Sequence, residues 1–349
     1  MAKSKFLKRP VRPVEIIQGA EVSELLSRMG ETAFQGKNLA IAVDVWEQML
    51  RGDVTIFFGL AGAMVPAGMR RVVVHLLKSK LIDCLVSTGA NLFHDIHETL
   101  GKYHWQGHAT ANDEELKDEG IDRIYDVFAV EDEFQSADAY CYRFSKTLEK
   151  KPYTTREFLY LLGKQLSKGA KEDGILTAAY KTNIPVYCPA IGDSSIGIGL
   201  AMNPKEDNFL FDVIGDVKET ALIAARAKNT GVVYAGGGTP KNFIQQTEVT
   251  AGIMGENVSG HKYAVQITAD APHWGGLSGC TFEEAQSWGK IAKKAKMVTV
   301  HCDTTIALPI MVTALAKRMK GFKRKGANLK FPLYASKTKR GGKYTQRHK

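Results

Sequence analysis

The residue types best suited to covalent chemistry lie together in the segment Thr281-Phe282-Glu283-Glu284-Ala285-Gln286-Ser287-Trp288-Gly289-Lys290. Lys290 stands two residues after a tryptophan and directly after a glycine, which lets other groups approach the backbone closely. A lysine amine that packs against an indole and loses water is deprotonated more easily. The neutral amine is the form that Schiff-base chemistry requires. Lys290 is therefore a candidate nucleophile, with Trp288 and Glu284 beside it.

A helix is expected to position this segment. Thr281 and Glu284 have the spacing of a capping box, which marks a helix start. Apolar residues then recur every three or four positions, namely Phe282, Ala285, Trp288, Ile291, Ala292 and Ala295. On this pattern the helix continues past Lys290. The alternative interpretation is that Lys290 begins a solvated basic helix face, which Lys293, Lys294 and Lys296 continue.

Short apolar runs alternate with helix-length segments along the chain, a pattern typical of parallel strands with crossover helices. The runs are residues 54–58, 82–86, 184–187, 231–234, 263–267 and 297–301. Helical spacing covers 21–50, with breaks expected at Gly30 and Gly36, and also 69–80. We expect an α/β fold, a doubly wound and mostly parallel Rossmann-like sheet with helices on both faces. The ends of the runs then meet at the carboxyl edge, where such sheets bind ligands.

Three glycines at one of these ends could form a phosphate-binding turn. Gly236-Gly237-Gly238 follows an apolar run and precedes Pro240, which suits the first turn of a helix. The triplet lacks the dinucleotide fingerprint, so by itself it also fits a plain tight turn. Asp193 and Asp303 end two other runs and could accept ribose hydroxyls. Small residues close two more runs, Thr88-Gly89 and Thr268-Ala269.

Together, these segments resemble the deoxyhypusine synthase family. The stretch from Glu284 to Lys290 is similar to the family's active-site segment, in which the lysine of Ser-Trp-Gly-Lys carries the covalent intermediate. Other segments follow in the family's order: Ala33-Phe34-Gln35-Gly36-Lys37-Asn38-Leu39, Phe57-Phe58-Gly59-Leu60, Asn183-Ile184-Pro185-Val186, the three glycines, and Cys302-Asp303-Thr304. The resemblance covers residues 30 to 318.

The resemblance implies bound NAD, a polyamine substrate and a homotetramer with active sites between subunits. The residues that would line NAD are Thr88, Gly89, Asp193, Gly236, Gly237, Gly238, Thr268, Ala269 and Asp303. In the family's mechanism, NAD takes a hydride from the carbon that bears the amine, and Lys290 would capture the resulting butylimine as a Schiff base. A second amine then displaces the lysine, and NADH returns the hydride.

Several positions depart from the family where it binds the polyamine. A polycation needs carboxylates along its pocket, yet Phe93 and His94 replace the family's adjacent acidic pair. Ile198 and Leu277 replace two further acids, and Asn242 replaces a histidine. The loop at Gly62-Ala63 also lacks the usual Ser-Asn pair. New side chains, Asp270, His273 and Trp274, stand near the catalytic segment.

These departures predict a changed substrate. We expect transfer of a 4-aminobutyl group from a polyamine or diamine to a small amine, as in a homospermidine synthase. Phe93, His94, Asn242, His273 and Trp274 are the expected substrate-binding residues. The alternative within the family is a true deoxyhypusine synthase that modifies a protein lysine.

A metal-dependent amine or amidine hydrolase is an alternative from another class. His94-Asp95-Ile96-His97 is followed by His104 and His108, and His94 and His97 lie one helical turn apart. This spacing allows two histidines to share a divalent ion. Clustered histidines on a helix are more often hydrogen-bonded structural groups, and no second set of ligands is evident. No metal is therefore included among the expected cofactors.

The net charge of +10 belongs to the end of the chain. Residues from Arg318 to Lys349 include twelve Lys or Arg and no Asp or Glu, whereas the rest holds 35 basic and 37 acidic residues. Such a tail could contact RNA, as in a ribosome-associated protein without enzymatic activity. A solvated, poorly ordered terminus is commoner, so nucleic acid is not an expected partner.

The length of 349 residues allows a large core. We divide the chain into an extended lead-in (1–20), a single NAD-binding domain (21–330) and a basic tail (331–349). No apolar run reaches 18 residues and no signal region follows the basic start, so we expect a cytoplasmic protein without a membrane partner. The five scattered cysteines are expected to be buried free thiols.

Overall fold

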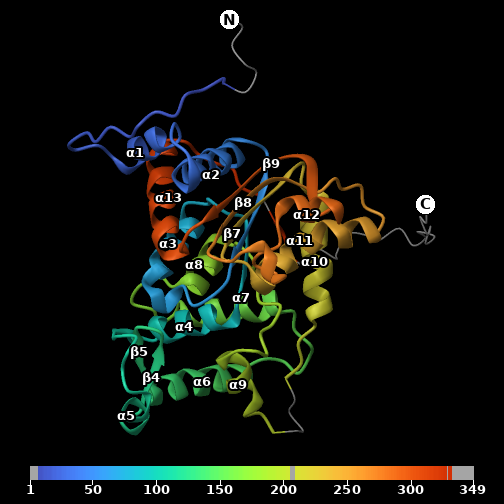
Figure 1. The fold of residues 1–349 in the computed structure, drawn as a ribbon. Coiled ribbons are helices and arrows are strands. Elements are labelled where there is room, and N and C mark those ends of the chain that lie inside the picture. Colours follow the sequence, from blue (N-terminus) through green and yellow to red (C-terminus); the bar gives the residue numbers. More distant parts are fainter. Residues whose placement is uncertain (1–6, 205–208, 328, 332–349) are drawn as a thin grey trace, which may run out of the picture.

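A six-stranded parallel sheet forms the centre of the protein in the computed structural model, which describes residues 7–204, 209–327 and 329–331 (Figure 1). The strand order is β6-β2-β1-β7-β8-β9, and every neighbouring pair is parallel. The strands are β1 (Thr55–Leu60), β2 (Cys84–Ser87), β6 (Val186–Tyr187), β7 (Thr230–Ala235), β8 (His261–Thr268) and β9 (Ile291–His301). The predicted α/β fold is confirmed, and each of the six apolar runs contributes to one strand.

Helices cover both faces of this sheet. Successive residues of a strand point to opposite faces, and accordingly Phe57 and Phe58 of β1 belong to different hydrophobic cores. One face packs against α10 (Val213–Arg226), α11 (Gly238–Ile253) and α12 (Phe282–Ser287); the other packs against α1 (Val22–Met29), α2 (Phe34–Arg51), α3 (Arg70–Lys78), α4 (Gly89–Thr99), α7 (Thr155–Leu166), α8 (Ile175–Thr182) and α13 (Thr304–Arg318). Figure 1 shows these two layers on either side of the sheet.

A second, antiparallel sheet lies in the lower part of Figure 1 and has the order β3-β5-β4. It consists of β3 (Trp105–Gln106), β4 (Ile121–Ile124) and β5 (Val127–Val130), and α5 (Asp113–Asp118), α6 (Glu131–Ser145) and α9 (Ser195–Ala201) accompany it. This sheet was not predicted from the sequence. Its strands have only two to four residues, β4 includes Asp122 and Arg123, and the four apolar residues of β5 run directly into α6.

The prediction that one helix continues through Lys290 is wrong. Helix α12 ends at Ser287, and β9 begins at Ile291. Gly289 lies between them with a φ of 71°, a left-handed conformation that glycine adopts without strain. Ile291 begins β9, pairs with His261 and is buried in the core of one sheet face, so the helical spacing beyond Ser287 is coincidental. The alternative of a basic helix face is equally wrong, since Lys293, Lys294 and Lys296 are exposed residues of β9, the strand at one edge of the sheet.

The expected break at Gly30 is confirmed, because Gly30 ends α1. The expected break at Gly36 is wrong: Gly36 is the third residue of α2, where the first backbone amides have no partner within the helix and a glycine disturbs little. The five cysteines carry no disulfide; Cys84, Cys141 and Cys188 are buried as expected, whereas Cys280 and Cys302 are half-buried.

No helix of the described residues is both long and apolar enough to cross a membrane. The domain boundaries remain predictions. Apart from Phe331, the predicted basic tail lies outside the described residues, as do the first six residues of the lead-in.

Candidate functional site

Four loops meet at the carboxyl edge of the large sheet and bring most of the predicted cofactor residues together. Thr88 follows β2, and its hydroxyl donates a hydrogen bond over 3.3 Å to the carbonyl of Gly62 in the loop after β1. A Cβ atom placed on Gly89 would lie 2.4 Å from Oγ of Ser194, which is next to Asp193. The loop after β6 therefore lies directly against the start of α4, and only glycine fits at position 89.

The three glycines form the turn between β7 and α11. Gly236 and Gly238 have φ angles of 80° and 54°, so this turn requires glycine. A Cβ atom on Gly237 would lie 2.4 Å from Cα of Ser278, which comes from the loop after β8. The amide of Gly238 donates to Oγ of Ser278 at 3.0 Å. The first turn of α11 is thus covered by Ser278, and a phosphate at this turn would compete with that hydroxyl.

The remaining predicted cofactor residues follow β8 and β9. Thr268 is the last residue of β8, and its carbonyl accepts a hydrogen bond from the amide of Cys302. Asp303 is exposed and is the N-cap of α13, where its Oδ1 accepts from the amide of Thr305 over 2.7 Å. Hydrogen bonds from Thr305 lower the pKa of Asp303, so this carboxylate stays ionised and available to hydroxyl groups.

A cavity of about 330 Å³ opens between the carboxyl ends of β8 and β9 and the loop that precedes α12. Its polar lining includes Asn38, Gln266, Thr268, Asp270, Cys280 and Glu283. Two carboxylates at the wall of one cavity suit a cationic ligand. Among the residues that the departures from the family singled out, Asp270 is the one that lines this cavity.

The buried lysine Lys241 connects this cavity to the glycine turn, and the sequence analysis did not identify it as a site residue. Only 1% of Lys241 is exposed. Its amine donates to Oε1 of Gln266 at 2.9 Å and also to the carbonyls of Ser278 and Cys280. Burial lowers the pKa of Lys241 to about 8. A lysine in the first turn after a glycine-rich loop was the signal that could have revealed it.

The backbone amide and the backbone carbonyl of Lys290 both form hydrogen bonds. Its amide donates to the carbonyl of Ala285 in α12 at 3.1 Å, and its carbonyl accepts from the amide of His261 at 3.0 Å. The amine lies over the indole of Trp288, 5.3 Å from the ring centroid, which is a cation–π distance. Trp288 itself is 66% exposed, and Glu284 is exposed as well. The indole therefore supports the amine on one side and leaves the other side open.

The backbone of Lys290 lies where β8 begins, whereas the cofactor loops lie where the strands end. His261 is the first residue of β8 and Thr268 the last, a separation of roughly 23 Å at about 3.3 Å per residue. Helix α12 spans part of this distance along the face of the sheet. The charge of Lys290 contributes, after burial, to the lowered pKa of Lys241. The lysine side chains thus belong to one electrostatic neighbourhood although their backbones lie apart.

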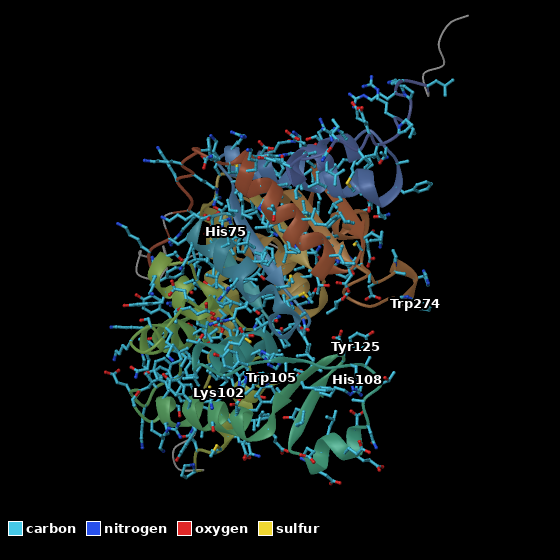
Figure 2. The ribbon with its side chains drawn as sticks, turned by 90° about the vertical axis from the view of Figure 1, so that its left-hand side faces the viewer. His75, Lys102, Trp105, His108, Tyr125 and Trp274 are labelled. Carbon is cyan, nitrogen blue, oxygen red and sulfur yellow. The ribbon has the colours of Figure 1, made fainter. Side chains whose placement is uncertain are left out.

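The predicted substrate residues are not gathered in one place. His273 and Trp274 lie in the short helix η3 (Pro272–Trp274) after β8; their rings are 4.3 Å apart, and Trp274 is 72% exposed. In Figure 2, Trp274 projects on the same side of the molecule as Tyr125 of the small sheet. Asn242 is half-buried in the first turns of α11.

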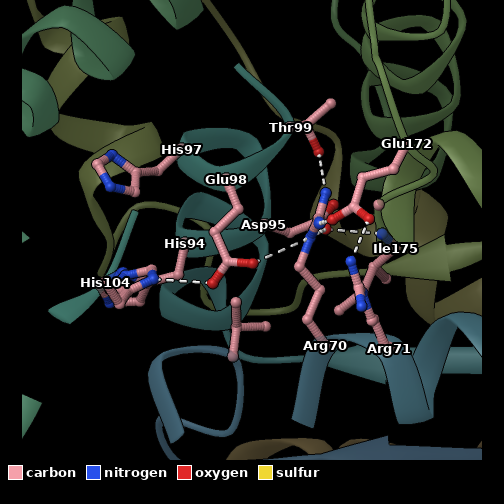
Figure 3. A network of polar contacts seen from close by, with 12 residues as sticks. Arg70, Arg71, His94, Asp95, His97, Glu98, Thr99, His104, Glu172 and Ile175 are labelled. Carbon is pink, nitrogen blue, oxygen red and sulfur yellow. Dashed lines mark hydrogen bonds and ion pairs between the residues drawn. The ribbon is translucent and has the colours of Figure 1, made fainter. Parts of the chain in front are cut away.

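Phe93 and His94 are buried in α4, away from any open surface. The Phe93 ring packs 5.4 Å from that of Phe134 in α6. Nδ1 of His94 lies 2.9 Å from Nε2 of His104, whose Nδ1 lies 2.8 Å from Oε1 of Glu98 (Figure 3). Burial, and then the charges of His104 and His97, lower the pKa of His94 to about 3. Within a single chain, Phe93 and His94 therefore pack in the interior between α4 and its neighbours.

The same network gives no support to a metal-dependent hydrolase. Glu98 also pairs with Arg70, whose buried guanidinium contacts Asp95 at 2.8 Å and Glu172 at 2.8 Å (Figure 3). Glu98 and Asp95 are thus occupied with His104 and Arg70. Nε2 of His97 lies within hydrogen-bond distance of the carbonyl of Tyr103, whereas its buried Nδ1 has no hydrogen-bond partner among the described residues. Across the described ranges, no three His, Cys, Asp or Glu side chains converge on a point where a metal ion could bind.

Comparison with known proteins agrees with the predicted family and with the fold. The family model "Deoxyhypusine synthase" matches residues 24–315. The chain is 52% identical to "Probable deoxyhypusine synthase 2" of Methanosarcina acetivorans, over 93% of this chain and 94% of that protein. It is 41% identical to "Probable deoxyhypusine synthase 1" of the same organism, over 91% and 98%. A solved Entamoeba histolytica structure assigned to deoxyhypusine synthase has a TM-score of 0.58 at 18% identity, over 85% of this chain and 93% of that one.

Proposed function

Because the chain belongs to the deoxyhypusine synthase family, we propose that it transfers a 4-aminobutyl group from a polyamine to a small amine through a Schiff base on Lys290. The observation that carries this proposal is the Lys290 amine over the Trp288 indole, within the family's Ser-Trp-Gly-Lys segment. Membership of the family makes the protein a transferase of aminobutyl groups. The identity of the acceptor and the residues of the site are the proposed part.

The residues at the carboxyl edge fit NAD. The amide of Gly238 at the start of α11 donates to the hydroxyl of Ser278, a contact that a phosphate oxygen of NAD would take over. The carboxylates of Asp193 and Asp303 are exposed nearby and can accept ribose hydroxyls. When bound, NAD would accept a hydride from the carbon that carries the amine and return it at the end of the cycle.

Lys290 performs the covalent steps in this proposal. Its neutral amine attacks the carbon of the oxidised donor, forms a C=N bond to the butyl group and releases the remainder of the polyamine as an amine. The acceptor amine then attacks the same carbon, and Lys290 leaves as a free amine, so the atoms and electrons balance. The indole of Trp288 stabilises the cationic forms of the nitrogen. Glu284, Asp270 and Glu283 supply carboxylates for the cationic substrate.

A small amine as acceptor is supported by two observations. Positions where the family has acidic residues hold apolar or imidazole side chains here: Ile198 and Leu277 are exposed, and Phe93 and His94 are buried. Fewer carboxylates suit a smaller cation than spermidine. In addition, the chain is more similar to the second of two Methanosarcina acetivorans paralogues, at 52% against 41% identity. A division of substrates between paralogues would account for the changed positions.

A second subunit is part of this proposal. Four large apolar side chains near the predicted site are exposed in the single chain, namely Ile198, Trp274, Leu277 and Trp288. Exposed apolar groups of this size mark surfaces that another chain covers. A neighbouring subunit over Trp288 would also place its own cofactor loops near Lys290. The lysine would then act on a cofactor held by the neighbour, and the distance to the loops of its own chain would not matter. The family's homotetramer has active sites between subunits.

Product analysis tests the choice of acceptor. Purified protein with NAD is offered spermidine together with a panel of acceptors: putrescine, other diamines and a lysine-containing protein substrate. We expect an aminobutylated diamine, with no net production of NADH. The same assay with Lys290→Ala should give no product, because the imine has no carrier. Transfer to the protein lysine alone would favour a true deoxyhypusine synthase and would exclude the small-amine acceptor.

A further inference from the structure

We infer that a buried network of Thr230, Glu248 and His261 positions the reactive lysine, through the His261 amide that donates a hydrogen bond to the carbonyl of Lys290. This inference rests on the proposed role of Lys290. None of the three residues touches the amine itself, so they are positioning residues. Thr230 begins β7, His261 begins β8, and Glu248 of α11 contacts both side chains. This is the end of the strands opposite the cofactor loops.

The first observation is the close approach between Gly260 and the Lys290 segment. Gly260 is buried and has a φ of 84°. A Cβ atom there would lie 2.7 Å from the amide nitrogen of Ala292, 2.7 Å from the carbonyl carbon of Ile291 and 3.1 Å from the carbonyl oxygen of Gly289. These backbone atoms flank Lys290 on both sides. The segment that carries the lysine therefore rests directly on the backbone of Gly260.

The second observation is that buried side chains hold Gly260 and His261 in place. Oε2 of Glu248 accepts a hydrogen bond from the amide of Gly260 at 3.2 Å. Oε1 of Glu248 lies 2.6 Å from the hydroxyl of Thr230, which in turn lies 2.9 Å from Nδ1 of His261. Nε2 of His261 lies 3.3 Å from the carbonyl of Ile244. All three side chains are buried, so the network is shielded from water and rigid.

The network reaches Lys290 through one hydrogen bond. The amide of His261 donates to the carbonyl of Lys290, and the amide of Lys290 is bonded to Ala285. A shift of Gly260 or His261 would therefore move the lysine backbone relative to Trp288. A misplacement of about 1 Å at a reacting group can cost on the order of a hundredfold in rate. The buried groups need not contact the substrate to influence the chemistry.

Borohydride trapping of the Lys290 imine, with NAD and spermidine, measures this effect. In Gly260→Ala we expect the rate constant for trapping to fall about tenfold or more, while the spermidine concentration for half-maximal rate stays within about twofold. Thr230→Val replaces only the hydroxyl with a methyl group. We expect a smaller fall in the rate constant for trapping, again with little change in the spermidine concentration for half-maximal rate. This second variant keeps the test valid where Gly260→Ala does not fold.

Two matched variants control for loss of stability. Gly255→Ala introduces the same backbone strain, since Gly255 has a φ of 86°, but its Cβ would contact nothing within 4 Å. Thr220→Val removes a buried hydroxyl whose hydrogen bond goes to the carbonyl of Asp216 on the same helix, α10, away from the network. Both should trap at the wild-type rate. Trapping that falls in these controls as much as in Gly260→Ala would overturn the inference, as would wild-type trapping in Gly260→Ala.

A readout without polyamine separates this inference from the proposed function. Lys290 is labelled with pyridoxal 5′-phosphate and borohydride at one fixed pH, and its peptide is quantified by mass over time. We expect the rate of labelling to change in Gly260→Ala and not in Gly255→Ala, because the amine leaves the indole. If the wild type traps no aminobutyl group, the proposed function fails, and the labelling rates alone decide the inference. Equal labelling rates in wild type and Gly260→Ala would overturn it.

Discussion

At the scale of single residues, two lysines divide the work of the proposed site. Lys290 is half-buried, supported by the indole and held at both backbone ends. Lys241 is enclosed by three oxygen acceptors that come from β8 and from the loop before α12. An enclosed amine of this kind can fix the loop that covers the glycine turn. Its role is to hold Ser278 and Cys280 in place next to the cavity.

The lowered pKa of Lys241 predicts a stability that rises with pH. Because its pKa is about 8 in the folded chain and 10.5 in its unperturbed state, the unfolded chain binds more protons between these values. The free energy of unfolding should therefore increase from pH 8 towards pH 10.5, by an amount on the order of 2–3 kcal/mol from this group.

Lys241→Met removes the titrating amine and keeps the length of the side chain. Urea unfolding of both proteins between pH 7 and pH 10.5 gives the difference that belongs to Lys241, since the other groups are common to both. We expect the gap in unfolding free energy between wild type and variant to change in favour of the wild type as the pH rises. If the difference in unfolding free energy does not depend on pH, the pKa of the Lys241 amine is not lowered in the folded chain.

At the scale of elements, the site depends on strand ends and on loops that cross over them. The apolar runs predicted all six strands of the large sheet, because buried stretches of parallel strands read as continuous apolar segments, and even the partly exposed β9 ends in one. The segment after Ser287 was mispredicted as helix because pairing between β8 and β9 overrides the local spacing. The buried contacts of Lys241 were beyond sequence reasoning, since its partners Gln266 and Cys280 lie 25 and 39 residues further along the chain.

The contact between the start of α4 and the loop after β6 gives a test at this scale. In Gly89→Ala, the new Cβ would displace Ser194 together with Asp193. We expect the affinity for NAD to fall about tenfold or more, which corresponds to ~1.4 kcal/mol. Gly192→Ala is the matched control, because its Cβ would meet nothing within 4 Å on the same loop. Calorimetric titration with NAD measures both, and equal affinities would remove Gly89 and Asp193 from the proposed cofactor site.

At the scale of the whole molecule, the predicted catalytic and cofactor residues lie at two edges of one sheet. The carboxyl edge gathers the glycine turn, Thr88, Thr268 and Asp303, whereas the peptide unit of Lys290 is bonded to the amino end of β8. The exposed indoles of Trp274 and Trp288 point to coverage by another chain. In the proposed function, a second subunit would thus complete a site that one chain supplies only in part.

The intact mass of the protein after incubation with NAD and spermidine and reduction with borohydride tests whether Lys290 forms a Schiff base. We expect an added aminobutyl group in the wild type, located on the peptide that contains Lys290. Lys290→Ala should carry no such group, whereas Lys294→Ala, which alters an exposed lysine of the neighbouring strand β9, should react like the wild type. An unmodified wild-type protein that binds NAD, or an adduct that persists in Lys290→Ala, would contradict the Schiff-base mechanism.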